Sequence, residues 1–122
     1  MKIIIPVEEK TEDTKVCVSF GRTPYFGIYN TEDNSFNFIE NNAAEASGGA
    51  GIKAAQQIAD EEVEILLTPR CGENAVEVLK AAEIKLYKTT DKTAMENIKM
   101  YLDGELNELT EFHGGFQGRG AN

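Results

Sequence analysis

Cysteine is scarce in this sequence of 122 residues, which has only Cys17 and Cys71, far apart in the chain. The two residues form no Cys-x-x-Cys pair and no dense pattern of the kind that cross-links small secreted domains. We therefore expect two free thiols. Free thiols are typical of a reducing compartment, so the sequence predicts a cytoplasmic protein.

A long apolar run is also missing. The first apolar stretch, residues 2–7, is far too short for a signal-peptide core or a membrane span, and it leads directly into charged residues. We interpret this stretch as a β-strand and expect no membrane as a partner.

Positive charge is in deficit, with 12 lysines and arginines against 21 acidic residues and a formal net charge of −9. A field of this sign repels phosphate backbones and anionic lipid. Nucleic acid is therefore not expected as a partner.

The residues that common hydrolytic mechanisms need are missing or badly placed. Histidine occurs once, as His113, and no Gly-x-Ser-x-Gly turn is present. The first predicted strand carries no carboxylate for a two-metal site, and the acidic run at residues 8–13 is typical of a solvated loop. We expect a binding protein and no enzyme.

The chain is nevertheless rich enough in apolar residues, at 41%, to form one core without disulfides or a structural metal. We expect a single α/β domain over residues 1–109. Glycine becomes too dense after that for regular structure, so residues 110–122 are predicted to form a flexible tail.

The first part of the chain has the pattern of β-strands. Residues 2–7 predict a buried central strand, and residues 25–29 and 36–39 flank a turn-rich stretch of hairpin length. These three strands are expected to form an antiparallel meander.

The second part alternates helices and strands. Apolar residues at helical spacing predict helices at residues 50–61, 75–82 and 94–102, and short apolar strands are expected at 63–67 and 84–87. Thr93 and Glu96 have the spacing of a capping box, and Gly104 is a suitable stop. The order predicts a mixed five-stranded sheet with helices on its faces.

Four stretches of the chain, at residues 19–26, 48–56, 72–75 and 81–87, resemble successive motifs of a known family. This is the dinitrogenase iron-molybdenum cofactor biosynthesis family of nitrogenase accessory factor-like proteins. The resemblance implies a ribonuclease-H-like α/β/α fold with strand order 3-2-1-4-5 and strand 2 antiparallel. It also implies binding or carriage of an iron-sulfur or iron-molybdenum cluster precursor, with cluster-assembly proteins as partners.

The sequence departs from the family pattern at three places. Ser19 stands where members often have a histidine before Phe-Gly-Arg, which removes an obvious soft-metal ligand. The stretch Gly72-Glu73-Asn74 lacks the family's proline. Of the histidine-rich tail that many relatives carry, only His113 remains.

With this strand order, a ligand site is expected at the switch point between the first strand and the strand at 63–67. Its crevice should be lined by residues 7–9 and 68–72. The second helix offers backbone N–H groups there, near Gly72 and Asn74, with Arg70 close by. Arg22 is expected either to approach from its loop or to form a surface ion pair. The site should favour an anion, and such clusters are anionic.

Two residues are candidate metal ligands. Cys71 lies at the predicted start of a helix, where the pKa of a thiol is lowered and the thiolate can bind metal. The alternative for Cys71 is a small, semi-buried loop residue. His113 could supply a second ligand from a flexible arm, or it could be an ordinary tail residue. Cys17 lies between two valines and is expected to pack within a strand.

The glycine-rich stretch at residues 47–51 precedes the first helix without the Lys-Ser or Lys-Thr pair of a phosphate-binding loop. We interpret it as a site of close helix-sheet packing, with anion contact as the alternative.

Two functional hypotheses follow. The first is a carrier of an iron-sulfur or iron-molybdenum cluster precursor, and the second is a metal-free module of the same fold that binds a small anion or a protein partner. The predicted site residues are Arg22, Arg70, Cys71, Gly72 and Asn74, with Cys71 and His113 as metal ligands.

Overall fold

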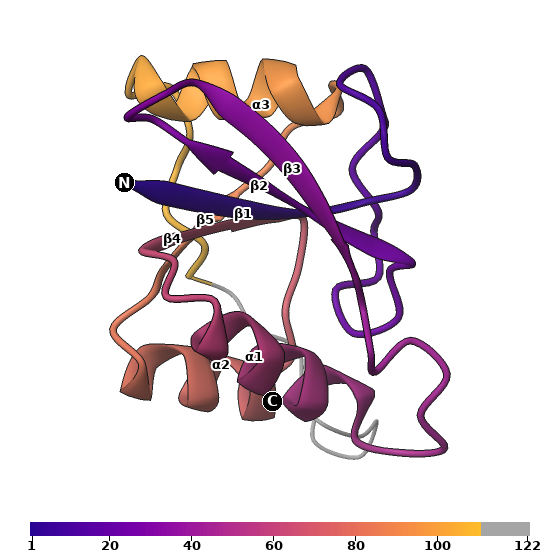
Figure 1. Cartoon of the computed structure of the whole chain (residues 1–122). Helices are drawn as coiled ribbons and strands as arrows, with labels where there is room; N and C mark the ends of the chain where they lie inside the picture. The colour runs from indigo at the N-terminus through magenta and orange to yellow at the C-terminus, as the bar shows by residue number, and fades with distance from the viewer. Residues whose placement is uncertain (111–122) are drawn as a thin grey trace.

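The computed structural model describes residues 1–110, in which five strands form one sheet in the order β3-β2-β1-β4-β5. Figure 1 shows α1 and α2 together on one face of this sheet and α3 on the other. The predicted three-layer α/β/α fold is therefore confirmed. The elements are β1 (Lys2–Val7), β2 (Tyr25–Asn30), β3 (Ser35–Glu40), α1 (Ala50–Asp60), β4 (Ile65–Thr68), α2 (Glu73–Ala81), β5 (Lys85–Lys88) and α3 (Ala94–Leu102).

Strand directions also agree with the prediction. β2 is antiparallel to both β1 and β3, whereas β4 is parallel to β1 and to β5. Most of the predicted tail, from residue 111 on, lies outside the described residues, as does His113.

The central strand β1 is buried on both faces. Ile4 packs in the core cluster under α1 and α2, and Ile3, Ile5 and Val7 pack in the second cluster under α3. This two-sided burial explains why its sequence is almost continuously apolar. Burial of each of these side chains contributes about 1.5–3 kcal/mol.

Small residues bring α1 close to its neighbours. A Cβ atom built on Gly51 would lie 3.7 Å from the Cβ of Ala75 in α2. A Cβ atom on Gly21 would lie only 2.9 Å from the Gly51 nitrogen. The prediction of close helix-sheet packing is therefore corrected, because Gly51 faces a second helix and the loop at Gly21.

The start of α3 is held by the predicted capping box. Thr93 N donates to Glu96 Oε1 at 3.0 Å, and Glu96 N donates to Thr93 Oγ1 at 3.2 Å. Asn97 is fully buried. Its Nδ2 donates to the backbone carbonyls of Thr90, Lys92 and Thr93, and its Oδ1 accepts from Thr90 N. These bonds fix the loop before α3 to the helix. The helix ends before Gly104, whose φ is 76°.

The edge of the sheet at β5 is covered by a later part of the chain. Residues 107–109 run beside β5, where Lys88 N donates to Asn107 O at 2.8 Å and Leu109 N donates to Leu86 O at 2.9 Å.

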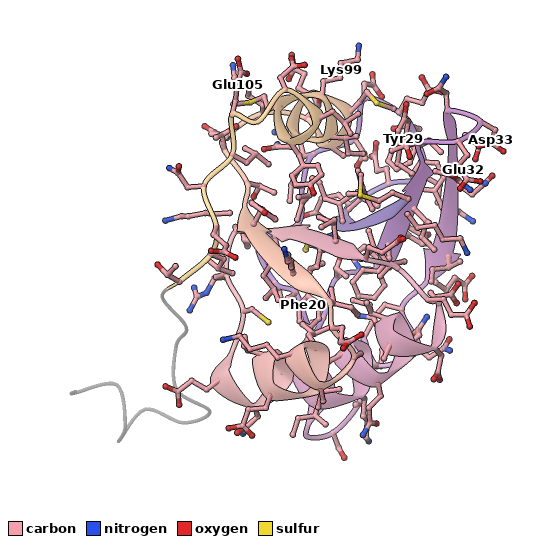
Figure 2. The ribbon with its side chains drawn as sticks, turned by 90° about the vertical axis from the view of Figure 1, so that its left-hand side faces the viewer. Phe20, Tyr29, Glu32, Asp33, Lys99 and Glu105 are labelled. Carbon is pink, nitrogen blue, oxygen red and sulfur yellow. The ribbon has the colours of Figure 1, made fainter. Side chains whose placement is uncertain are left out.

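Figure 2 shows Lys99 on the α3 side of the molecule and Phe20 on the side of α1 and α2. Among residues 1–110, no helix is long and apolar enough to cross a membrane.

Candidate functional site

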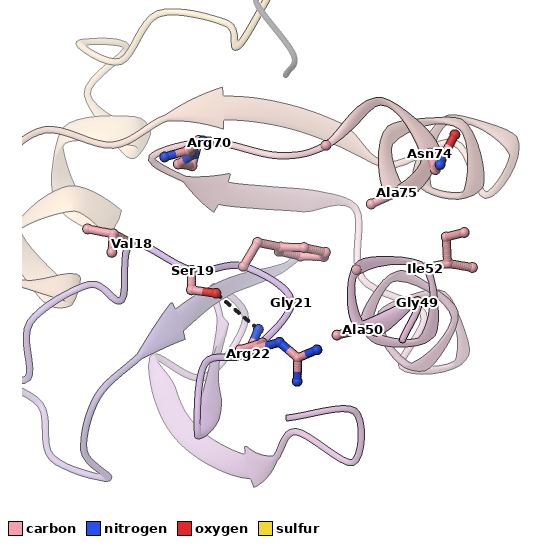
Figure 3. A pocket seen from close by; sticks show the side chains of 13 residues that line it. Val18, Ser19, Gly21, Arg22, Gly49, Ala50, Ile52, Arg70, Asn74 and Ala75 are labelled. Carbon is pink, nitrogen blue, oxygen red and sulfur yellow. Dashed lines mark hydrogen bonds between the residues drawn. The ribbon is translucent and has the colours of Figure 1, made fainter. Parts of the chain in front are cut away.

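A hollow of about 470 Å³, which we call the loop-helix pocket, opens where the loop at residues 18–22 meets the first turns of α1 and α2. Figure 3 shows this pocket, with Arg22 extending from the loop toward Ala50 at the start of α1. The contact of Gly21 with Gly51 fixes the distance between the loop and the helix. The sequence at Gly21 therefore shapes the wall of the pocket.

Both helices that reach the pocket begin with glycine as their N-cap residue. Gly49 precedes α1 and Gly72 precedes α2, and no side chain in the described part of the chain caps either helix. Gly49 has a φ of 68°, a conformation that favours glycine. First-turn N–H groups without a side-chain cap, together with the positive end of each helix dipole, favour an anion.

Arg22 is held in place by hydrogen bonds to uncharged groups. Its Nη1 donates to Ala44 O at 3.0 Å, and its backbone N donates to Ser19 Oγ at 3.3 Å. Among residues 1–110 it makes no ion pair, so this part of the chain gives no support to the alternative of a surface ion pair for Arg22.

Arg70 is exposed on the other side of the pocket, directly after β4. Within the described residues its side chain makes neither a hydrogen bond nor an ion pair. The loop that carries it is fixed by Thr68, whose Oγ1 donates to Arg70 O at 3.0 Å. Within residues 1–110, therefore, no group occupies its guanidinium.

The charges that line the pocket have one sign. Its described lining residues include Arg22 and Arg70 and no aspartate or glutamate. Ser19 and Asn74 add polar side chains, and Val18 and Ile52 add apolar surface. A chain with a net charge of −9 thus has a locally positive hollow that also has an apolar wall.

Four of the predicted site residues, namely Arg22, Arg70, Gly72 and Asn74, are brought together in this pocket. The expected contribution of residues 7–9 is wrong. Glu8 instead lines a separate hollow of about 740 Å³ with Pro69 and residues 89–93. The reason is that Val16 bridges to Val7 and Cys17 N donates to Pro6 O at 2.9 Å, so residues 15–17 lie antiparallel beside the end of β1.

Cys71 does not face the pocket. Its side chain is completely buried in the core cluster under α1 and α2, and desolvation raises its pKa to about 12, opposed by a backbone hydrogen bond from Gly72. The predicted lowering of this pKa is wrong, because burial outweighs the helix N-terminus. Burial and the raised pKa both oppose the predicted role of Cys71 as a metal ligand. Cys17 is buried, as expected, but it lies in the loop between β1 and β2 rather than in a strand.

No group of three or more potential metal ligands among His, Cys, Asp and Glu occurs within residues 1–110. His113, the second predicted ligand, lies outside this part of the chain. The described side of the pocket can therefore hold an anionic ligand by hydrogen bonds and charge rather than by coordination.

The start of α1 also belongs to the site, although anion contact was only the alternative interpretation of its sequence. Its signal was the glycine-rich stretch at residues 47–51, for which packing was preferred over anion contact. In the structure Gly49, Ala50 and Gly51 line the same pocket as the start of α2. Two helix N-termini, rather than one, thus face the ligand space.

Fold and pocket together define a small α/β binding protein. The family described as dinitrogenase iron-molybdenum cofactor matches residues 1–104, and the chain belongs to this family. An uncharacterized protein of Methanocaldococcus jannaschii, MJ0580, is 30% identical over 112 residues, which cover 89% of this chain and 92% of the relative.

Solved structures share the fold. The apo form of the orange protein from Desulfovibrio gigas has a TM-score of 0.83 at 29% identity, covering 89% of this chain and 92% of that one. A Thermotoga protein, TM1290, provisionally named a NifB protein, has a TM-score of 0.79 at 38% identity, covering 91% and 95%. The family and these likenesses support an accessory or binding role.

Proposed function

We propose that the protein binds and carries an anionic iron-sulfur or iron-molybdenum cluster precursor in the loop-helix pocket. The observation that carries the proposal is the meeting of two glycine-capped helix N-termini with Arg22 and Arg70, without a lining carboxylate. Membership of the iron-molybdenum cofactor family supplies the kind of anion. The role is one of binding and transfer, in the cytoplasm and with cluster-assembly proteins, and involves no catalysed reaction.

The strength of such a site suits a carrier. Each hydrogen bond from a charged group contributes about 1.5–3 kcal/mol, and each helix N-terminus about 0.3–2 kcal/mol. The cost of association is at least about 4 kcal/mol, so these contacts support reversible rather than permanent binding. A cargo held without covalent ligands can be passed on without breaking a metal-thiolate bond.

The burial of Cys71 favours a second candidate function. Because the described residues offer no exposed thiolate and no cluster of metal ligands, a metal-free small anion would fit the same contacts. This protein would then be a binding module of the same fold for an anionic metabolite.

Anaerobic reconstitution distinguishes the two functions. The protein is incubated with ferrous iron and sulfide, with and without molybdate, and desalted; bound iron, molybdenum and sulfide are then measured with the visible spectrum. We expect retained metal and sulfide with visible absorption bands. Replacing both Arg22→Gln and Arg70→Gln should reduce retention about tenfold, since two charged hydrogen-bond donors are lost.

Lys99→Gln is the matched control, because it removes one positive charge from α3 on the other side of the sheet and should leave retention unchanged. Cys71→Ala, if folded, should also retain the metal. If the protein retains no metal but inorganic phosphate raises its melting temperature, and the double arginine variant abolishes that shift, the second function is the correct one.

A further inference from the structure

The outer edge of β3 is uncovered, in contrast to the edge at β5. Residues 107–109 bond to β5, but no segment within residues 1–110 pairs with β3 except β2. Figure 1 draws β3 in front of β2 and β1, at the margin of the sheet. Residues 1–110 therefore cover one edge of the sheet and leave the other edge open.

The backbone groups that point outward can be identified. Bonded and non-bonded pairs alternate along an antiparallel ladder. Just past the end of β3, Asn41 N donates to Pro24 O at 3.1 Å, so odd-numbered residues of β3 bond to β2. The N–H groups of Phe36, Phe38 and Glu40 thus face the open edge. Only Glu40 O is already used there, by Gln57 Nε2 at 2.7 Å.

This edge also lacks the usual devices that prevent strand addition. Natural edge strands are protected by lysine, proline, bulges or short length. Ser35–Glu40 contains neither lysine nor proline, and six consecutive residues pair with β2 without a bulge. The edge is therefore suited to pairing with another strand.

The two faces beside the edge differ in polarity. Phe36 and Phe38 lie half-buried on the α3 face, with ring centroids 4.7 Å apart. On the opposite face Asn37 is exposed, and Ile39 next to it is half-buried against the cluster under α1 and α2. A strand added here would place apolar residues beside the two rings and polar residues beside Asn37.

The charges at the ends of the edge indicate the sign of the partner. Glu32 and Asp33 are exposed at the turn before β3, labelled in Figure 2, and Glu40 is exposed at its other end. In a pair of β3 strands from two copies, Glu40 of one copy would approach the acidic turn of the other. Charge therefore opposes a second copy and favours a basic strand.

We propose that the outer edge of β3 binds an extended segment of a partner protein as an additional strand. The segment alternates apolar and polar residues and carries lysine or arginine at both ends. Main-chain hydrogen bonds to Phe36 and Phe38 provide the pairing, and the acidic ends fix its position. This surface is separate from the loop-helix pocket, and the inference does not depend on the ligand there.

The test is an NMR titration of the whole protein with the blocked peptide Lys-Val-Thr-Val-Thr-Val-Lys. We expect saturable shifts of the Phe36, Phe38 and Glu40 amide signals. The same peptide with glutamate at both ends should bind at least about fivefold more weakly, because its charges repel the acidic ends.

Two protein variants test the two parts of the contact. Asn37→Lys adds a positive charge at the exposed middle of β3 and should weaken binding of the basic peptide about fivefold. Asn107→Lys is its control, since it adds the same charge beside β5. Phe38→Pro removes an outward N–H without removing a bond to β2, and should weaken binding at least about fivefold. If Phe38→Pro fails to fold, Asn37→Lys still provides the test.

The proposal is overturned if the three β3 amides do not respond, or if Asn37→Lys and Asn107→Lys bind the peptide equally. It is also overturned if sedimentation shows a dimer of the unmodified protein that Asn37→Lys dissociates. That result would assign the edge to a second copy.

Discussion

Gly21 and Gly48 lie near the same pocket but differ in the space around them. A methyl group on Gly21 would lie 2.9 Å from the backbone nitrogen of Gly51, whereas one on Gly48 would meet nothing within 4 Å. Gly21→Ala should therefore lower the free energy of unfolding by about 1–3 kcal/mol, because backbone atoms must move apart. Urea unfolding measures this loss.

Gly48→Ala is the control and should unfold at almost the same urea concentration as the unmodified protein. Equal midpoints for Gly21→Ala and the unmodified protein would show that the loop does not press against α1 as described.

The buried thiol of Cys71 predicts a pH dependence of stability. The pKa is about 12 in the folded protein and 9.0 for the free group, so the unfolded chain ionises first as pH rises. Stability is almost unaffected up to about pH 8 and falls as pH rises through the pKa of the free thiol, by about 1.4 kcal/mol at pH 10. Unfolding free energies measured between pH 8 and pH 10 test this.

Cys71→Ala should be less stable at pH 8 but should lose less of its stability between pH 8 and pH 10. A thiol reagent should also react with Cys71 only on unfolding. Rapid reaction of the native protein at Cys71 would contradict its burial.

Residue chemistry was easier to predict than side-chain direction. The sequence predicted Arg22, Arg70, Gly72 and Asn74 around one site, and all four line the loop-helix pocket. Cys71 lies equally close along the chain, but its side chain points into the core. The sequence predicts which helix or strand end lies near a residue. Whether the side chain of that residue is buried depends on packing with residues that are distant in the chain.

At the scale of elements, the capping box makes α3 dependent on two side chains. Thr93→Ala should cost about 1 kcal/mol, because Glu96 N loses its side-chain acceptor and the reciprocal bond is weakened. Thermal unfolding followed by circular dichroism measures the loss. Thr11→Ala, in an exposed loop, is the control and should be neutral.

The bonds to Thr93 lower the pKa of Glu96, so its ionised form is the stabilising one. This contribution is present above the pKa of free glutamate, 4.5, and is lost as pH falls below it. The difference between Thr93→Ala and the unmodified protein should therefore shrink in acid. A difference that stays constant down to pH 3 would exclude the carboxylate from the cap.

Elements with local signals were predicted well. The capping box and the hairpin of β2 and β3 depend on residues a few positions apart, and both appear in the structure. The path of residues 15–18 was not predicted. It depends on Val16 meeting Val7 and on Lys15 meeting Thr93, contacts between distant residues that a sequence pattern does not encode.

At the scale of the whole molecule, the net charge of −9 predicts a response to salt. Repulsion among exposed carboxylates opposes the compact state, and salt screens it. The melting temperature should therefore rise by a few degrees between low and moderate sodium chloride concentrations. Asn107→Lys, which changes the charge from −9 to −8, should show a smaller rise. A fall with added salt would show that attractive pairs dominate.

The overall charge of the chain does not describe the charge of its site. It indicated an acidic surface, yet the loop-helix pocket is lined by arginines and helix N-termini. Backbone dipoles contribute nothing to a count of charged residues. The site could be inferred only by adding the direction of the helices to the composition.

The strip of chain beside β5 has a consequence for how the protein can be shortened. The family match stops at residue 104, but Leu106 and Leu109 are buried and residues 107–109 cover β5. A version cut at Gly104 would have an unpaired edge strand on each side of the sheet, β3 on one side and β5 on the other. Since the two flanks differ, molecules could join head to tail without closing, and the expected product is a growing fibre.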